Sequence, residues 1–90
     1  MSLLSGLLSQ AFGREPIHLL ARRDKFFPQR FRWRGHVYNV QAVTRAWTET
    51  QRGGKVKRYG FRVYCHEGSF ILYEDVLRQT WYLDAQVGLR

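Results

Sequence analysis

The fold class of this chain is decided by one stretch of its sequence, Arg30-Phe31-Arg32-Trp33-Arg34-Gly35-His36-Val37-Tyr38-Asn39-Val40. The first five residues alternate between arginine and aromatic side chains, and a period of two is typical of a β-strand. Phe31 and Trp33 then share one face of the strand, and the three arginines share the other. A glycine in a two-residue loop is a hairpin signal, so we expect Gly35-His36 to turn the chain into a second strand.

The downstream residues continue as an antiparallel meander. We expect turns near residues 51–55, 67–68 and 75–79, and between them strands over residues 37–48, 56–66, 69–74 and 80–85. Neither parity of the first of these strands stays apolar throughout, which indicates a bulge near residues 41–43. Closing or covering a sheet removes its exposed edges. The prediction is therefore a mostly β domain over residues 30–85, a curled antiparallel sheet or small barrel of about five strands.

The residues outside this domain are expected to play smaller parts. Residues 1–13 predict a short amphipathic helix, because apolar side chains recur there at helical spacing: Leu3, Leu4, Leu7, Leu8 and Phe12. This helix either covers the chain's own sheet or docks on a second copy or another protein. Residues 14–29 are expected to be a connector packed on the domain, with a short edge strand over residues 17–21, and residues 86–90 a tail.

The charge of the chain is +8, and twelve of its fifteen basic residues are arginine. Residues 14–62 carry thirteen basic residues against three acids, a net +10, whereas residues 63–90 carry two against four, a net −2. The planar guanidinium suits phosphate contacts and stacking better than the ammonium of lysine. This asymmetry favours a polyanionic partner. The alternative is that the charge only promotes solubility.

A family resemblance rests on the spacing of aromatic residues and glycines. It begins at Pro28, includes Phe31, Trp33 and Gly35, and continues through Tyr59-Gly60-Phe61-Arg62-Val63-Tyr64, Phe70-Ile71-Leu72-Tyr73 and Trp81-Tyr82-Leu83. Over residues 28–85 the chain resembles a bacterial family of small β-rich domains of uncharacterised function. Some relatives are associated with proteins similar to Y-family translesion polymerases. The resemblance implies a context in DNA repair or replication and brings no catalytic residues with it.

The reactive side chains do not form a catalytic pattern. Cys65 and His66 are neighbours on a predicted strand, so they point to opposite faces and cannot share a metal ion. Cys65 has the parity of apolar neighbours, which predicts a buried, inert thiol. Glu74 and Asp75 lack the further acids of a two-metal nuclease, and Gly53-Gly54 lacks the spacing of a phosphate-binding loop. The sequence predicts neither an enzyme nor a cofactor or metal.

A nucleic-acid-binding module is the function that the sequence favours, with contacts directed at the backbone rather than at base sequence. The arginines on alternate positions of the first strand are spaced by about 6.6–6.8 Å, near the phosphate repeat of an extended backbone. A second basic group follows in the next hairpin, and an aromatic ring beside it is a candidate for base stacking. The predicted contacts are Arg30, Arg32, Arg34, Arg52, Lys55, Lys57, Arg58, Arg62 and Tyr64.

The competing function is a protein–protein interaction or assembly module. It would use the leucine-rich helix and the aromatic surface, and its partner would be another protein or a second copy of this chain. A lone cysteine predicts a reducing compartment, and no apolar run approaches the roughly 20 residues of a membrane span. We therefore expect a cytoplasmic protein that has no membrane partner.

Overall fold

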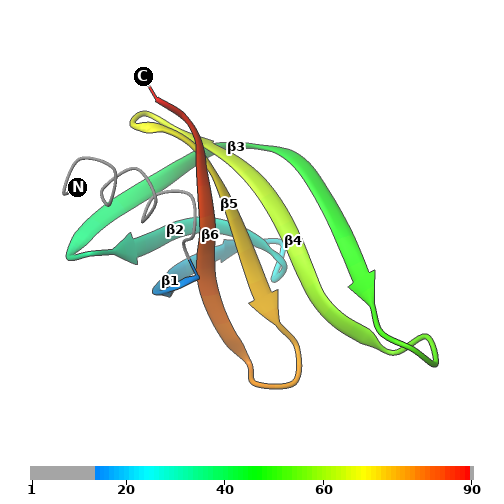
Figure 1. Ribbon diagram of the computed structural model, residues 1–90. Coiled ribbons are helices and arrows are strands. Elements are labelled where there is room, and N and C mark those ends of the chain that lie inside the picture. Colours follow the sequence, from blue (N-terminus) through cyan, green and yellow to red (C-terminus); the bar gives the residue numbers. More distant parts are fainter. Residues whose placement is uncertain (1–13, 90) are drawn as a thin grey trace, which may run out of the picture.

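Six antiparallel strands form a closed barrel in the computed structural model, which describes residues 14–89 (Figure 1). Each strand pairs with the next one in the sequence, and the first also pairs with the last. The strands are β1 Glu15–Arg23, β2 Phe27–Trp33, β3 His36–Thr50, β4 Val56–Cys65, β5 Gly68–Asp75 and β6 Thr80–Leu89. The prediction of a mostly β chain and a small antiparallel barrel is confirmed.

The predicted strand count was wrong, because the barrel has six strands and not about five. The additional strand is β1, which includes the short edge strand expected over residues 17–21 and extends over most of the connector. The turn from β1 to β2 places Asp24 and Lys25 at positive φ, 55° and 59°. Glycine usually occupies such positions, so this turn carries no glycine signal. The predicted helix over residues 3–12 lies outside the described residues, and β6 continues past residue 85, where we expected its end.

The hairpin near Gly35 is present, but its loop starts one residue earlier than predicted. Trp33 pairs with His36, so the loop consists of Arg34 and Gly35, at φ 52° and 79°. Positive φ at both positions is the geometry of a type I′ turn, which matches the twist of the flanking strands. Arg34 thus lies in the turn and not on the strand. The expectation that it shares a strand face with Arg30 and Arg32 was wrong.

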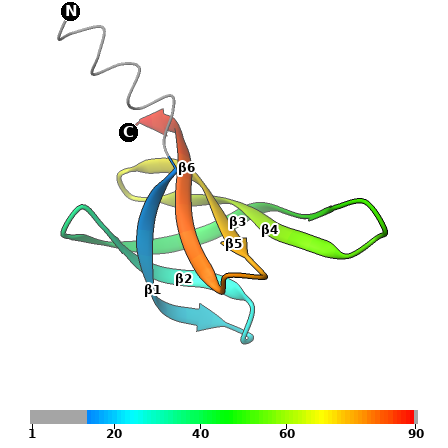
Figure 2. The ribbon, with the colours of Figure 1, turned by 60° about the horizontal axis from the view of Figure 1, so that its bottom comes forward.

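Strand β3 belongs to two parts of the barrel. Its first residues pair with β2, and the remainder pairs with β4 from Val40↔Cys65 onward. The register shifts between Val40 and Ala42 and again between Val43 and Arg45, so the predicted bulge is confirmed. Bulges bend a strand and increase its twist. The far half of β3 runs with β4 as a long hairpin that extends away from the barrel (Figure 2).

Aromatic rings dominate the core in two groups. Phe31, Tyr38 and Phe70 contact one another, with the rings of Phe31 and Tyr38 stacked at 5.2 Å. In the second group, Phe61 lies between Phe26 on one side and Trp81 on the other. Phe31, Phe61 and Phe70 have no exposed surface. Such rings bury roughly 150–250 Å² each, which compensates for the small size of the chain.

Candidate nucleic-acid interface

Three carboxylates on the strands are already paired with arginines, and a fourth, Asp24 in the β1–β2 turn, lies 4.0 Å from Arg23. Glu15 accepts hydrogen bonds from Arg34 at 2.7 and 2.5 Å, Glu49 accepts one from Arg58 at 2.8 Å, and Glu74 accepts one from Arg22 at 3.0 Å. The hydrogen bond from Arg34 holds the pKa of the Glu15 carboxyl below its usual value. These pairs sort the basic residues into those committed to the fold and those still available for a partner.

Arg34 and Arg58, two of the predicted phosphate contacts, belong to the committed set. Arg58 is half-buried, and its guanidinium lies 3.8 Å from the centre of the Tyr73 ring. It also donates hydrogen bonds to the Tyr82 hydroxyl and to Glu49. Removing its side chain would take packing and hydrogen bonds from the barrel. Arg58 is therefore a poor choice for testing a binding surface.

Two arginines face each other across β3 and β4 on the outside of the barrel. Arg45 is the register partner of Arg62, and both side chains are exposed. Among the described residues neither forms an ion pair. Like charges directly opposite one another on a sheet are destabilising. An anion placed between the two guanidinium groups would offset that repulsion and accept bidentate hydrogen bonds.

The space between these arginines is a shallow hollow of about 370 Å³, also lined by Thr44 and Ser69. The Thr44 hydroxyl donates to the backbone carbonyl of Arg62 at 3.2 Å. The guanidinium of Arg45 lies 5.5 Å from the centre of the Trp47 ring, which limits where its side chain can go. We call the four lining residues the β3–β4 hollow.

Arg45 was absent from the sequence prediction, whereas Arg62 was included. The signal for Arg45 is weak, because two register shifts separate it from the start of β3. The two shifts cancel, so a period of two counted from the exposed Val37 does place Arg45 on the outer face, but it does not give the residue that Arg45 faces on β4. Only the observed pairing with Arg62 brings it into the site.

Arg30 and Arg32 lie on the outer face of β2, as predicted, and both are exposed. Arg32 is flanked by His18 of β1 and Val37 of β3, and Arg30 by Asn39 of β3. Within residues 14–89 neither arginine has a carboxylate partner. Val37 is 43% exposed and Leu20 on β1 is 39% exposed. This outer face thus combines positive charge with apolar surface.

The remaining predicted contacts are divided between the hairpin tip and β4. Arg52 and Lys55 lie in the exposed β3–β4 turn, and Lys57 is exposed near the start of β4. Tyr64 is half-buried on the outer face, where its register partners are Ala42 and Ser69. Tyr64 and Arg62 are therefore two residues apart on β4 and lie on the same face of that strand. The structure brings Arg62 and Tyr64 together and leaves the Arg30–Arg32 pair on a different strand.

The side chains with catalytic potential remain apart in the structure. Within residues 14–89 there is no group of three His, Cys, Asp or Glu residues that could hold a metal ion. Cys65 has no exposed surface, as predicted, and burial raises the pKa of its thiol to about 12. In the part of the chain that is described, no helix is long and apolar enough to cross a membrane.

The buried thiol predicts slow chemistry and a specific pH dependence. At neutral pH the folded protein should react with a thiol reagent no faster than it unfolds, because the thiolate is the reactive form. As pH rises above about 9, the unfolded chain loses a proton that the folded chain keeps, so stability should fall. Urea midpoints at pH 8 and 9.5, compared with those of Cys65→Ala, measure this loss. Rapid labelling of the folded protein at pH 7 would contradict it.

The fold and the surface together define a class: a small six-stranded antiparallel β-barrel with arginines gathered on its outer face. Within this class the chain belongs to the family described as "Domain of unknown function (DUF6504)", whose model matches residues 8–87. This confirms the expectation of a small domain family of uncharacterised function. Comparisons with curated proteins and with solved structures found no match.

Proposed function

We propose that this barrel is a non-catalytic module that binds nucleic acid through backbone phosphates, without reading base sequence. The observation that carries the proposal is the pair Arg45 and Arg62, which face each other with no carboxylate partner among the described residues. A phosphate in the β3–β4 hollow would contact two guanidinium groups. Further contacts along the nucleic-acid strand would come from the exposed Arg30, Arg32, Arg52, Lys55 and Lys57.

The resemblance noted above supports a context for this function. Its link to translesion-polymerase-like proteins suggests a cytoplasmic accessory role in DNA repair or replication. The basic residues are spread over β2, β3, β4 and the β3–β4 turn. Such a distribution favours contacts with several phosphates in succession, which is the pattern of sequence-independent binding.

The proposal is tested by the salt dependence of binding. Fluorescence anisotropy with labelled single-stranded DNA, duplex DNA and RNA should give a linear fall of log K with log salt, because bound cations release counterions. Arg45→Gln/Arg62→Gln should weaken binding at least about tenfold and reduce the slope by about 2, since each phosphate contact contributes about 1.

The control is Arg23→Gln/Lys25→Gln, which makes the same change of net charge at the end of β1 and in the turn that follows, where Arg23 pairs with Asp24 at 4.0 Å. It should change affinity much less than the variant of the β3–β4 hollow. Equal losses in the two variants would mean that overall charge, and not this site, drives binding. No binding of any strand at low salt would exclude the function.

A protein-binding role is the second candidate, and it is favoured by the outer face of β1, β2 and β3. Leu20 and Val37 are exposed there beside Arg30 and Arg32. Arginine is enriched at protein interfaces, and exposed apolar side chains often mark them. If Arg30→Gln/Arg32→Gln leaves nucleic-acid binding intact while Arg45→Gln/Arg62→Gln abolishes it, this face is available for a protein.

A further inference from the structure

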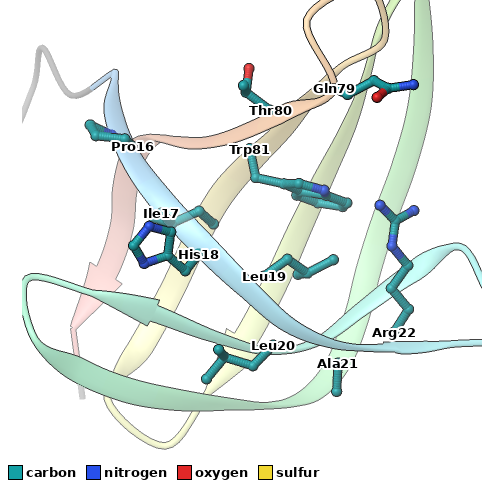
Figure 3. A pocket seen from close by; sticks show the side chains of 10 residues that line it. All are labelled: Pro16, Ile17, His18, Leu19, Leu20, Ala21, Arg22, Gln79, Thr80 and Trp81. Atoms are coloured by element: carbon teal, nitrogen blue, oxygen red, sulfur yellow. The ribbon is translucent and has the colours of Figure 1, made fainter.

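A hollow of about 620 Å³ opens where β1 and β6 separate (Figure 3). The two strands pair only through Glu15, Pro16 and Ile17 of β1, after which β1 continues with β2 alone. We call the space between them the β1–β6 hollow. Its volume is in the range of small-molecule sites, which are about 300–1,000 Å³.

Trp81 and Arg22 line the β1–β6 hollow, and the Trp81 ring contacts the buried Phe61 as well as the Arg22 guanidinium. Phe61 and Trp81 are stacked at 5.6 Å with an interplanar angle of 21°, and the guanidinium of Arg22 lies 5.2 Å from the centre of the Trp81 ring. Glu74 holds that guanidinium through an ion pair at 3.0 Å. Figure 3 shows Leu19, Trp81 and Arg22 around the same space, with Thr80 on the opposite side of β6 from the Trp81 ring. A nucleobase can stack on an arginine plane of this kind.

A second hollow of about 400 Å³ adjoins the first and is strongly basic. The two share Pro16, Thr80 and Trp81 in their walls. The second is lined by Arg14, Lys57, Arg58 and Arg78, against one carboxylate, Asp75. Arg58 is already paired with Glu49, so the remaining groups leave a net charge of +2. The guanidinium of Arg14 lies 5.3 Å from the centre of the ring of Tyr82, which is on β6 and also lines this second hollow.

We propose that the two adjoining hollows bind one nucleotide with a terminal phosphate, as a free mononucleotide or as a strand end. The base stacks on Arg22 above Trp81, within reach of the polar side chain of Gln79. The phosphomonoester lies among Arg14, Lys57 and Arg78. Its charge, between about −1.5 and −2 at pH 7, matches the net charge of the basic hollow better than the single charge of an internal phosphodiester does.

This site is separate from the β3–β4 hollow and does not rest on the proposed function, because a mononucleotide suffices to fill it. The probe is thymidine 5′-monophosphate, followed by ¹H–¹⁵N NMR on the full chain. The expected shifts are at the Trp81 indole, the Arg22 Nε–H and the amides of Thr80 and Tyr82. Thymidine and inorganic phosphate should each bind at least about tenfold more weakly than the nucleotide.

Variants separate the two halves of the site. Arg78→Gln should reduce the affinity for the nucleotide toward that for thymidine, and Arg22→Ala should reduce it toward that for phosphate. Arg30→Gln, with the same change of charge on β2, should have no effect. Arg45→Gln/Arg62→Gln should also leave mononucleotide binding unchanged, which distinguishes this site from the strand-binding surface.

Two results would overturn the proposal. If inorganic phosphate binds as tightly as the nucleotide, the basic hollow is only an anion site and the base makes no contact. If the nucleotide shifts resonances of Arg45 or Arg62 and none around Trp81, the β1–β6 hollow and the basic hollow beside it are not its site. Loss of strand binding alone would leave this inference standing, because Arg22, Arg78 and Trp81 belong only to the nucleotide site and Lys57 is the one residue that the two sites share.

Discussion

Replacing Phe61 with alanine should lower the free energy of unfolding by about 3–5 kcal/mol, the usual cost of truncating a buried phenylalanine. The Phe61 side chain has no exposed surface and contacts Phe26, Phe27 and Trp81. Removing its ring takes a packing partner from three rings, two at or just before the start of β2 and one on β6. For a chain of this length the total stability is roughly 5–13 kcal/mol, so a large part of it is at stake.

Urea unfolding followed by tryptophan fluorescence measures this loss, with circular dichroism to establish that the variant is folded. Phe61→Leu is the control, because it keeps most of the apolar volume and should cost clearly less. A loss below about 1 kcal/mol for Phe61→Ala would mean that the barrel interior repacks freely. The stack beneath the β1–β6 hollow would then not be a fixed platform.

Gly60→Ala should destabilise the barrel by about 1–3 kcal/mol, the typical cost of overpacking. A Cβ atom at this position would lie 2.3–2.6 Å from three atoms of the Trp47 indole, which crosses over the glycine from the neighbouring strand. The indole cannot move without loss, because its N–H donates to Glu49 at 3.0 Å and its ring contacts Tyr73. Arg45 packs on the same indole, so its guanidinium should be displaced as well.

A double-mutant cycle isolates this clash. In a Trp47→Ala background the space above residue 60 is open, so the further change Gly60→Ala should cost little or nothing. The coupling between the two positions should therefore be at least 1 kcal/mol, within the range of residues in contact. Additive effects of the two changes would show that the indole is not held over Gly60.

The ion pairs at Glu15, Glu49 and Glu74 explain why the sequence positions of the basic residues overestimate the number of cations that are free to bind a partner. Glu49 accepts a hydrogen bond from the Trp47 indole as well as from Arg58, and these bonds hold the pKa of its carboxyl below the usual value. Arg58 is therefore fixed in place by the barrel. The available cations lie elsewhere, and the pair Arg45 and Arg62 is the group in which an anion is most useful.

Much of the barrel could be predicted because alternation is a local property. The inward facing of Phe31, Phe61 and Val63 follows from a period of two, and each is fully buried. β1 was predicted only as a short edge strand over residues 17–21, outside the barrel, for two local reasons. Pro16 and Pro28 are typical strand breakers, and the turn at Asp24 and Lys25 adopts positive φ without a glycine.

The candidate site was less predictable than the fold, because register across bulges depends on the partner strand. Arg34 was placed on a strand by its parity, but the type I′ turn starts at that residue. Arg45 was left out, although it faces Arg62 directly. Each bulge in β3 shifts the parity by one residue, so the first bulge reverses the facing and the second restores it before Arg45. The facing of Arg45 can therefore be counted along the sequence, whereas its partner on β4 cannot.

By itself, the sequence determined the antiparallel β class, the turn near Gly35, the bulge in β3 and the burial of Cys65. These follow from residue type and from periods of two, which act over a few neighbouring residues. Only the tertiary structure decided that β1 closes the barrel against β6 and which arginines are held by Glu15, Glu49 and Glu74. It also decided that Arg45 on β3 is the register partner of Arg62 on β4. The physical reason is that strand register and ion pairs join residues that are far apart in the chain. A local sequence pattern does not identify these distant partners.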